Sequence, residues 1–113
     1  MRKTLTNIKH LIIDMDGVLY RGHQPIPGLG EFFTFLRQRS IGYILATNNS
    51  TRTPAQYARK LAHMGVTVRQ EEILTSAQAT AAYLADLAPP GTPVYVIGQD
   101  GLVAAMQERG YII

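Results

Sequence analysis

The stretch that decides the fold is His10-Leu11-Ile12-Ile13-Asp14-Met15-Asp16-Gly17, a short apolar run that stops at two carboxylates and a glycine. Such a run, rich in β-branched residues and closed by turn formers, is typical of a buried strand. Two similar runs follow at residues 42–46 and 94–97. Because none of these runs alternates with polar residues, they indicate a parallel sheet that is covered on both faces.

Apolar residues at helical spacing fill the intervals between these strands. We expect helices over residues 29–39, 54–64, 77–87 and 102–109, and a loop over residues 20–28. Thr53 followed by Pro54 suits a helix N-cap and first turn, and Ser76 suits the cap of the next helix. Gly65 suits the position just after a helix. This order predicts an α/β fold, a doubly wound parallel sheet of Rossmann-like type with three strands and flanking helices.

Composition narrows the class of protein. The chain has 113 residues, of which 46% are hydrophobic and 17% charged, so it is globular and fits one small domain or a piece of a larger one. It has no cysteine, which excludes disulfides, cysteine-bound metals and thiol catalysis. No apolar run is long enough for a transmembrane helix, and the basic N-terminus lacks the pattern of a signal peptide. We therefore expect a cytoplasmic protein without a membrane partner.

The charge balance is basic, with 11 lysines and arginines against 8 acidic residues. Such a balance suggests nucleic-acid binding. However, the basic residues are scattered along the sequence, and no aromatic residues alternate with them, so we expect no nucleic-acid partner. The three histidines, His10, His23 and His63, share no metal-ligand spacing, and packing or exposure accounts for them. A homo-oligomer is compatible with the sequence, which does not define the oligomeric state.

The two carboxylates that end the first strand are the first candidate site. In open parallel sheets, ligands bind beyond the carboxyl ends of the strands. Asp14 and Asp16, two residues apart, point to the same side and lie roughly 6–7 Å apart if the chain stays extended. Such a pair suits Mg²⁺, or a nucleophile working with a general acid. The alternative is that Asp14 caps the following turn and Asp16-Gly17 forms its corner.

Hydroxyls and amides end the second strand, in Thr47-Asn48-Asn49-Ser50-Thr51. They precede a helix N-terminus, where free N–H groups bind anions, although ordinary capping favours the same residue types. A right-handed crossover would place this segment beside Asp14 and Asp16. Two acids that face an anion site, with a metal to neutralise charge, are the groups that phosphoryl transfer uses.

Both segments resemble motifs of one enzyme family. Residues 11–19 resemble the first motif of haloacid dehalogenase-like phosphatases, and residues 47–50 resemble the second. Residues 20–22, 25–28, 75–76 and 94–98 are similar to the class IIA branch of NagD-like enzymes, p-nitrophenyl phosphatases, and phosphoglycolate and pyridoxal phosphate phosphatases. The resemblance covers nearly the whole chain.

The resemblance implies Mg²⁺-dependent hydrolysis of a small phosphomonoester, of the sugar phosphate, nucleotide, phosphoglycolate or p-nitrophenyl phosphate type. Asp14 would be the nucleophile that forms an aspartyl-phosphate. Asp16 would protonate the leaving alcohol and then activate water. Both acids would hold the metal, Asp16 through its main-chain carbonyl.

The resemblance also implies a phosphate-binding role for Thr47, Asn48 and Asn49, and close backbone approach to the phosphate at Gly17. The substrate partner would be a small phosphorylated metabolite.

The chain departs from the family pattern in its later part. The family has a later lysine that holds the phosphate, a later acidic pair and a cap domain. The lysines here, Lys3, Lys9 and Lys60, stand elsewhere, and Asp100 resembles a turn and helix cap. The resemblance therefore predicts that residues 1–113 are the N-terminal half of a core domain, cut short before the cap and incomplete or inactive alone.

Two other readings stay open beside the phosphatase. A non-catalytic domain could bind phosphate or a partner without turnover. A receiver-type phospho-acceptor module also has acids beyond a parallel strand, but it needs its acid pair before the phosphorylated residue and a late lysine. This chain has neither arrangement.

Overall fold

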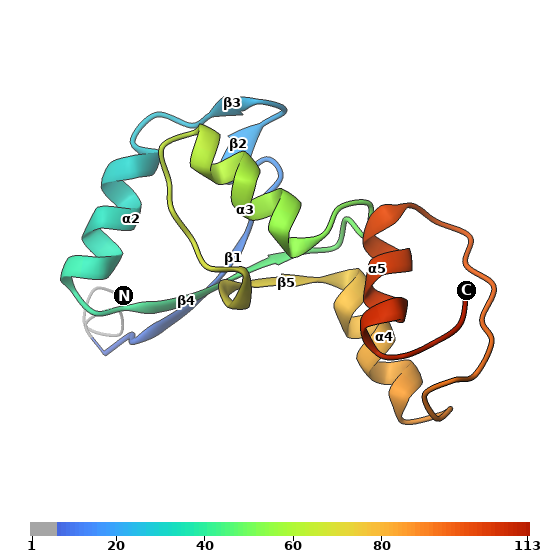
Figure 1. The fold of residues 1–113 in the computed structure, drawn as a ribbon. Coiled ribbons are helices and arrows are strands. Elements are labelled where there is room, and N and C mark those ends of the chain that lie inside the picture. Colours follow the sequence, from blue (N-terminus) through green and yellow to red (C-terminus); the bar gives the residue numbers. More distant parts are fainter. Residues whose placement is uncertain (1–6) are drawn as a thin grey trace.

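Three strands form a parallel sheet in the order β1-β4-β5 (Figure 1). The computed structural model describes residues 7–113, so the predictions on the first six residues, including Lys3, lie outside it. Strand β1 covers His10–Asp14, β4 covers Gly42–Thr47 and β5 covers Ile73–Thr75. Central β4 pairs with β1 in a register that sets Asp14 beside Ala46, and it pairs with β5 so that Thr47 faces Thr75. The first two strands and their adjacency agree with the sequence prediction.

The third strand is not where the sequence predicted it. Residues 94–97 form no strand, and Tyr95 and Ile97 are 92% and 88% exposed. The shorter run Ile73–Thr75 takes the place beside β4. There Ile73 and Thr75 are buried, whereas Val94 and Val96 pack against the second cluster of buried residues and Tyr95 and Ile97 lie in solvent.

All four predicted helices are present, with small shifts at their ends. They are α2 (Leu29–Gln38), α3 (Pro54–His63), α4 (Ser76–Ala85) and α5 (Asp100–Glu108), and a 3₁₀ turn, η1, covers Gln70–Glu72. None of the helices within residues 7–113 is long and apolar enough to cross a membrane.

The helix caps explain where two of these helices begin. Thr53 caps α3 as predicted: its Oγ1 accepts a 3.2 Å hydrogen bond from the Gln56 backbone, whose side chain accepts one of 2.8 Å from Thr53 N. The cap of α4 is Thr75, not Ser76, because Thr75 Oγ1 accepts the Gln78 N–H at 3.1 Å. Ser76 is instead the first residue of the helix.

The segment predicted as a loop contains a small hairpin. Strands β2 (Tyr20–Arg21) and β3 (Gln24–Pro25) pair antiparallel across Gly22. Gly22 has φ 59°, in the left-handed region that favours glycine. This hairpin follows directly on the acidic end of β1.

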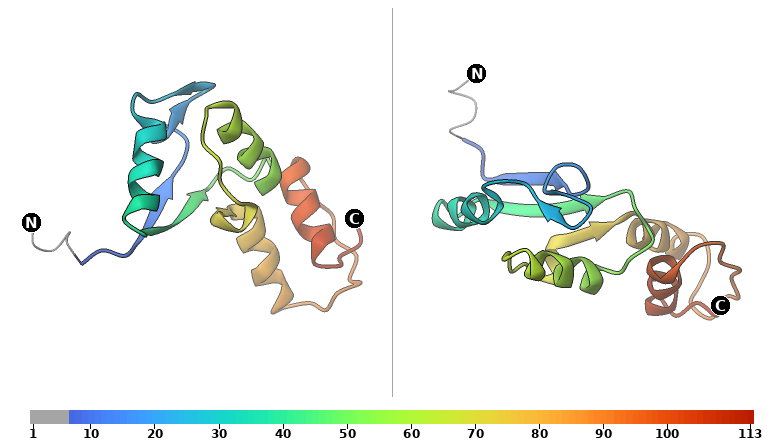
Figure 2. Two further views of the ribbon diagram at one scale, coloured as in Figure 1. Left: turned by 60° about the vertical axis from the view of Figure 1, so that its left-hand side comes forward. Right: turned by 90° about the horizontal axis from the view of Figure 1, so that it is seen from above.

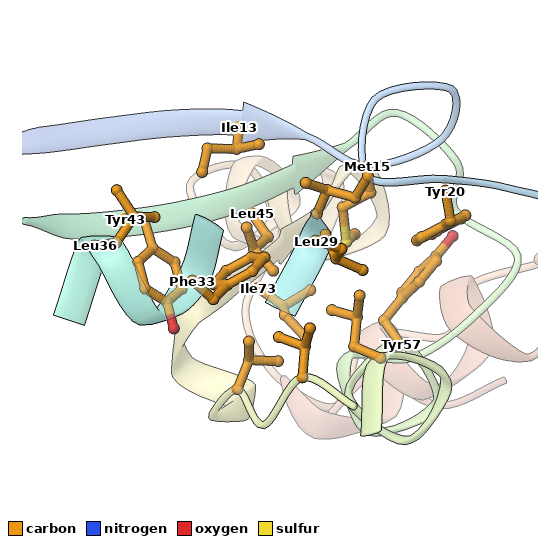
Figure 3. Close-up of a cluster of buried hydrophobic side chains, with 14 residues drawn as sticks. Ile13, Met15, Tyr20, Leu29, Phe33, Leu36, Tyr43, Leu45, Tyr57 and Ile73 are labelled. Carbon is orange, nitrogen blue, oxygen red and sulfur yellow. The ribbon is translucent and has the colours of Figure 1, made fainter. Parts of the chain in front are cut away.

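Helices α2 and α3 cover one face of the sheet and form the main core with it (Figure 3). Phe33 of α2 packs edge-on against Tyr43 of β4, with ring centroids 5.2 Å apart. Tyr57 and Leu61 of α3 are 2% and 0% exposed. Burial of such side chains contributes about 1.5–3 kcal/mol each, so this layer holds β1 and β4 in place.

The opposite face of the sheet is largely open. Ile12 of β1 is 83% exposed and Leu74 of β5 is 47% exposed. Helices α4 and α5 pack on each other as a second cluster at one end of the sheet (Figure 2). The radius of gyration, 16.3 Å, exceeds the value of about 13 Å for a compact chain of this size. Cover on both faces, as predicted from the apolar strands, is therefore wrong for residues 7–113.

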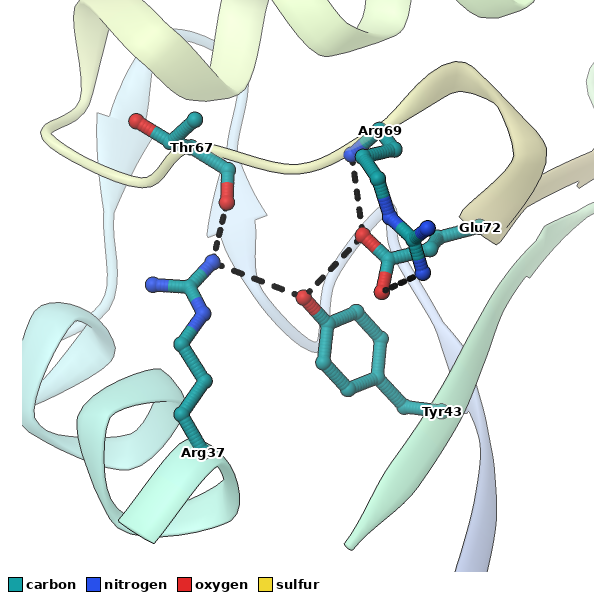
Figure 4. A network of polar contacts seen from close by, with 5 residues as sticks. All are labelled: Arg37, Tyr43, Thr67, Arg69 and Glu72. Atoms are coloured by element: carbon teal, nitrogen blue, oxygen red, sulfur yellow. Dashed lines mark hydrogen bonds and ion pairs between the residues drawn. The ribbon is translucent and has the colours of Figure 1, made fainter. Parts of the chain in front are cut away.

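A polar network joins α2 to the segment before β5 (Figure 4). Arg37 of α2 donates to the Thr67 carbonyl and, at 3.5 Å, to the Tyr43 hydroxyl. Tyr43 donates to Glu72 at 3.3 Å, and Glu72 forms an ion pair of 3.5 Å with Arg69. Burial raises the pKa of Tyr43. The network fixes β5 beside β4 from the edge away from the candidate site.

Candidate active site

Asp14 is the last residue of β1 and stands at the carboxyl edge of the sheet. Its Oδ1 accepts a 2.8 Å hydrogen bond from Met15 N. The Met15 side chain is fully buried in the core, while Asp14 and Asp16 on either side are exposed. This alternation is that of an extended chain, so the Asp14 and Asp16 side chains lie on the side opposite the buried Met15.

A tight turn follows Asp16. Gly17 has φ 80° and donates to the Tyr20 carbonyl at 2.8 Å, and Leu19 N donates to the Met15 carbonyl at 2.9 Å. A Cβ at Gly17 would have no atom within 4 Å. Glycine is therefore favoured here by the backbone angle, and the space at its missing Cβ is open.

The end of β4 is shaped by hydrogen bonds within its own loop. Buried Thr47 accepts the Asn49 N–H on Oγ1 at 3.1 Å. Asn49 Oδ1 in turn accepts from Thr51 N at 3.0 Å and from its hydroxyl at 2.7 Å. Ser76 Oγ donates to the Asn48 carbonyl at 3.0 Å, which ties this loop to α4. The Asn49 side chain is thus engaged within the loop, whereas that of Asn48 is exposed.

An open hollow of about 550 Å³ joins the two strand ends. Asp14, Thr47 and Asn48 line it, together with residues of β4, β5 and α4 and with Ile12. Asp16, Gly17 and Asn49 do not line this hollow. The structure therefore brings together three of the six predicted site residues around one space and sets the other three beside it.

Asp16 has neighbours that sequence reasoning did not connect with it. Tyr20 is fully buried, its hydroxyl has no hydrogen-bond partner in residues 7–113, and Lys60 Nζ lies 4.0 Å from its ring centroid. Burial raises the pKa of Tyr20, and the negative charge of Asp16 raises it further. Burial and the charge of Arg52 lower the pKa of Lys60, against the effect of Asp16.

These neighbours explain what the sequence analysis missed. Lys60 was compared only with the later phosphate-binding lysine of the family pattern, which stands at a different place in the chain. The contact of Lys60 with Tyr20 depends on how α3 lies against the turn from Asp16 to Tyr20, and no local pattern in the sequence signals it.

The carboxylate oxygens at the end of β1 suit part of a Mg²⁺ site. Residues 7–113 contain no group of three or more histidine, cysteine, aspartate or glutamate side chains able to hold a metal. They do place two exposed carboxylates, Asp14 and Asp16, at one strand end. Mg²⁺ is commonly bound by one or two carboxylates, waters and phosphate oxygens, so this hard-oxygen set fits that ion.

Several known proteins are similar to this chain in sequence and in structure. Residues 11–112 match the family described as haloacid dehalogenase-like hydrolase. An acid sugar phosphatase of Staphylococcus saprophyticus is 38% identical over 109 residues, which are 96% of this chain and 42% of that protein. NagD from E. coli K-12 is 33% identical with a TM-score of 0.81, over 94% of this chain and 42% of its own.

A glycerol phosphate phosphatase from Mycobacterium tuberculosis, solved in complex with calcium, is also similar. It is 31% identical with a TM-score of 0.82, and the match covers 95% of this chain and 31% of that one. The chain thus spans less than half the length of these relatives. The resemblance drawn from the two motifs and the α/β fold is confirmed.

Proposed function

Because this chain belongs to the haloacid dehalogenase-like hydrolase family, we propose that the protein is a Mg²⁺-dependent phosphatase of small phosphomonoesters. The observation that supports this most directly is the shared hollow of Asp14, Thr47 and Asn48. It sets a carboxylate beside a hydroxyl and an amide, which is a nucleophile beside groups able to hold phosphoryl oxygens.

The first step joins substrate to enzyme. A carboxylate oxygen of Asp14 attacks phosphorus, and the bond from phosphorus to the ester oxygen breaks. Asp16, protonated at this stage, gives its proton to the leaving oxygen, so that an alcohol departs. Thr47 and Asn48 hold the phosphoryl oxygens while an aspartyl-phosphate forms on Asp14. The exposed position of both acids leaves room for substrate.

The second step releases phosphate. Asp16, now a carboxylate, takes a proton from water, whose oxygen attacks the same phosphorus. The bond from phosphorus to the Asp14 oxygen breaks, which restores the Asp14 carboxylate and yields inorganic phosphate. Gly17, with open space at its missing Cβ, lets the main chain lie close to the phosphoryl group.

Mg²⁺ would be held by Asp14 and by Asp16, and when bound it neutralises the charge of the phosphoryl group. The glycerol phosphate phosphatase was solved in complex with calcium, which supports binding of a divalent cation by a relative of this chain. The relatives are named as acting on sugar phosphate and glycerol phosphate, and we extend that class, a small phosphorylated metabolite, to this protein. Within such an enzyme, residues 11–112 would be the part of the core that carries both motifs.

The test uses the protein expressed from its complete reading frame, with p-nitrophenyl phosphate and Mg²⁺. We expect turnover by the wild type and a loss of at least about a thousandfold in Asp14→Asn, because the amide is no nucleophile. Asp86→Asn, an exposed acid at the C-cap of α4, makes the same charge change away from the site and should keep full activity.

Two outcomes contradict the proposal. Hydrolysis that survives in Asp14→Asn would remove this residue as nucleophile. A wild type that binds inorganic phosphate without turning over any ester would favour the non-catalytic domain.

A further inference from the structure

Folding gathers basic side chains that are scattered in the sequence. A hollow of about 290 Å³ lies between α3 and the segment that joins β2 to β3. Its lining residues are His23, Arg52, Gln56, Arg59, Lys60, His63 and Met64. Five of the seven carry a cationic or protonatable group, and none is acidic. In α3, Gln56, Lys60 and His63 follow one another at spacings of four and three, with Arg59 beside Lys60, so they share one side of the helix, and Arg52 precedes it.

The basic side chains of this hollow form no ion pair within residues 7–113. The ion pair of residues 7–113 joins Arg69 to Glu72, and neither Arg52, Arg59 nor Lys60 takes part in one there. The charge of Arg52, after burial, lowers the pKa of Lys60, which means that the cations repel each other. The helix dipole favours Lys60 and His63 in the last turn of α3 but disfavours Arg52 before its first turn. Capping therefore does not explain the cluster.

The hollow adjoins the candidate active site through Lys60. The Lys60 ammonium lies over the ring of Tyr20, the residue paired with Asp16 in the turn after β1. The charge of Asp16 acts on Lys60, so the two groups are within electrostatic reach of each other. A ligand at Asp14 and Asp16 would therefore lie near the basic side chains of α3.

We propose that the hollow of Arg52, Gln56, Arg59, Lys60 and His63 binds an anionic group, a phosphate or a carboxylate, beside the active site. Arginine and lysine recognise such groups through charge-assisted hydrogen bonds, and Gln56 adds an amide donor. The anion is either a second charged group of the substrate or a free ion. The first source rests on the proposed phosphatase function; the second does not.

Binding is measured without catalysis, by titrating inorganic phosphate into the ¹⁵N-labelled protein expressed from its complete reading frame. Amides of residues 56–63 report on the hollow, and those of residues 47–49 report separately on the active site. We expect saturable shifts in residues 56–63, and a Kd there raised about fivefold or more by exposed Arg59→Gln. Arg109→Gln, an equal charge change at the C-cap of α5, should leave that Kd unchanged.

Substrate preference distinguishes a second charged group of the substrate from a free anion. We compare kcat/KM for fructose 1,6-bisphosphate and fructose 6-phosphate in the wild type and in Arg59→Gln. A preference for the bisphosphate that falls about fivefold in the variant supports a second substrate group. An unchanged ratio, with the phosphate titration still weakened, supports a free anion.

The failures of the two proposals are distinguishable. If neither p-nitrophenyl phosphate nor these two sugar phosphates are hydrolysed while residues 56–63 still saturate, the phosphatase function fails and the anion site stands. If residues 56–63 show no saturable shift, or if Arg59→Gln leaves their Kd unchanged, the anion site is overturned whatever the activity.

Discussion

The backbone N–H of Gly101, at the start of α5, donates a 3.1 Å hydrogen bond to the carbonyl of Thr51. This bond joins the first turn of α5 to the loop that follows β4. A Cβ on Gly101 would overlap the Ser50 carbonyl oxygen and lie 2.5 Å from that of Arg52. The close approach therefore requires glycine, and it holds in place the loop that carries the phosphate-binding candidates.

We expect Gly101→Ala to destabilise the protein by about 1–3 kcal/mol, because the added methyl group meets backbone atoms that cannot rotate away. The free energy of unfolding in urea measures this. Gly30→Ala is the matched control, since Gly30 lies in α2 with nothing within 4 Å of its missing Cβ. It should be neutral or stabilise by up to about 1 kcal/mol. Equal effects of both substitutions would contradict the packing argument.

Strand β1 and the start of helix α3 were predictable because local sequence patterns determine them. The apolar run before Asp14 and the Thr53-Pro54 pair each specify their element through nearby residues alone. The third strand was not predictable in this way. Residues 94–97 have the stronger strand composition, yet Ile73–Thr75 pairs with β4, because pairing depends on which segment the preceding helix delivers to the sheet.

Some residues of the candidate site could likewise be predicted from the sequence, and others could not. Asp14, Thr47 and Asn48 could be found from sequence, because parallel pairing of β1 and β4 brings their ends together. The contact of Lys60 with Tyr20 could not, because it depends on how α3 lies against the turn after β1. The basic residues that line the hollow beside α3 are scattered in the sequence, so the hollow could not be predicted from it either.

Tyr43→Phe tests the network between α2 and β5. The substitution removes the hydroxyl that donates to Glu72 and accepts from Arg37 but keeps the ring against Phe33. We expect a loss of about 0.5–1.5 kcal/mol in the free energy of unfolding. Tyr95→Phe, at a side chain 92% exposed, should change it by less than about 0.5 kcal/mol. If the two variants are equally stable, the network contributes nothing.

Stability should fall as the pH rises above about 10, through the buried tyrosines. The pKa of Tyr20 is raised by burial and by Asp16 from its ordinary value of 10.0. Above that value the unfolded state releases the phenolic proton while the folded state keeps it. The unfolded state then binds fewer protons, so the free energy of unfolding decreases with pH.

Urea unfolding at pH 9, 10 and 11 measures this slope. Tyr20→Phe should make it shallower, and it should keep the stability at pH 7 because the hydroxyl it removes has no partner in residues 7–113. Tyr83→Phe, at a side chain 67% exposed, should retain the wild-type slope. An unchanged slope in Tyr20→Phe would assign the effect to other groups.

Removal of divalent cations should abolish phosphatase activity. Without a cation, the Asp14 carboxylate and the dianionic ester repel each other. Dialysis against EDTA should reduce release of p-nitrophenol to background, and added Mg²⁺ should restore it. EDTA presaturated with Mg²⁺ is the control for inhibition by the chelator itself. Full activity after dialysis would contradict a metal-dependent mechanism.

Substitutions of Thr47 distinguish its role in the shape of the loop from its proposed contact with phosphate. Its Oγ1 accepts the Asn49 N–H, and Thr47 is one of the residues that line the hollow containing Asp14. Thr47→Ser keeps the hydroxyl, so we expect kcat/KM for p-nitrophenyl phosphate within about threefold of wild type. Thr47→Val keeps the volume but removes both interactions, and we expect a loss of about 10²-fold or more, the usual effect of deleting one oxyanion donor. Urea unfolding of both variants shows whether the loss in Thr47→Val exceeds what reduced stability explains. Equal kcat/KM in the two variants would mean that the hydroxyl serves neither the loop nor the phosphate, and would move phosphate binding to Asn48 and the main chain.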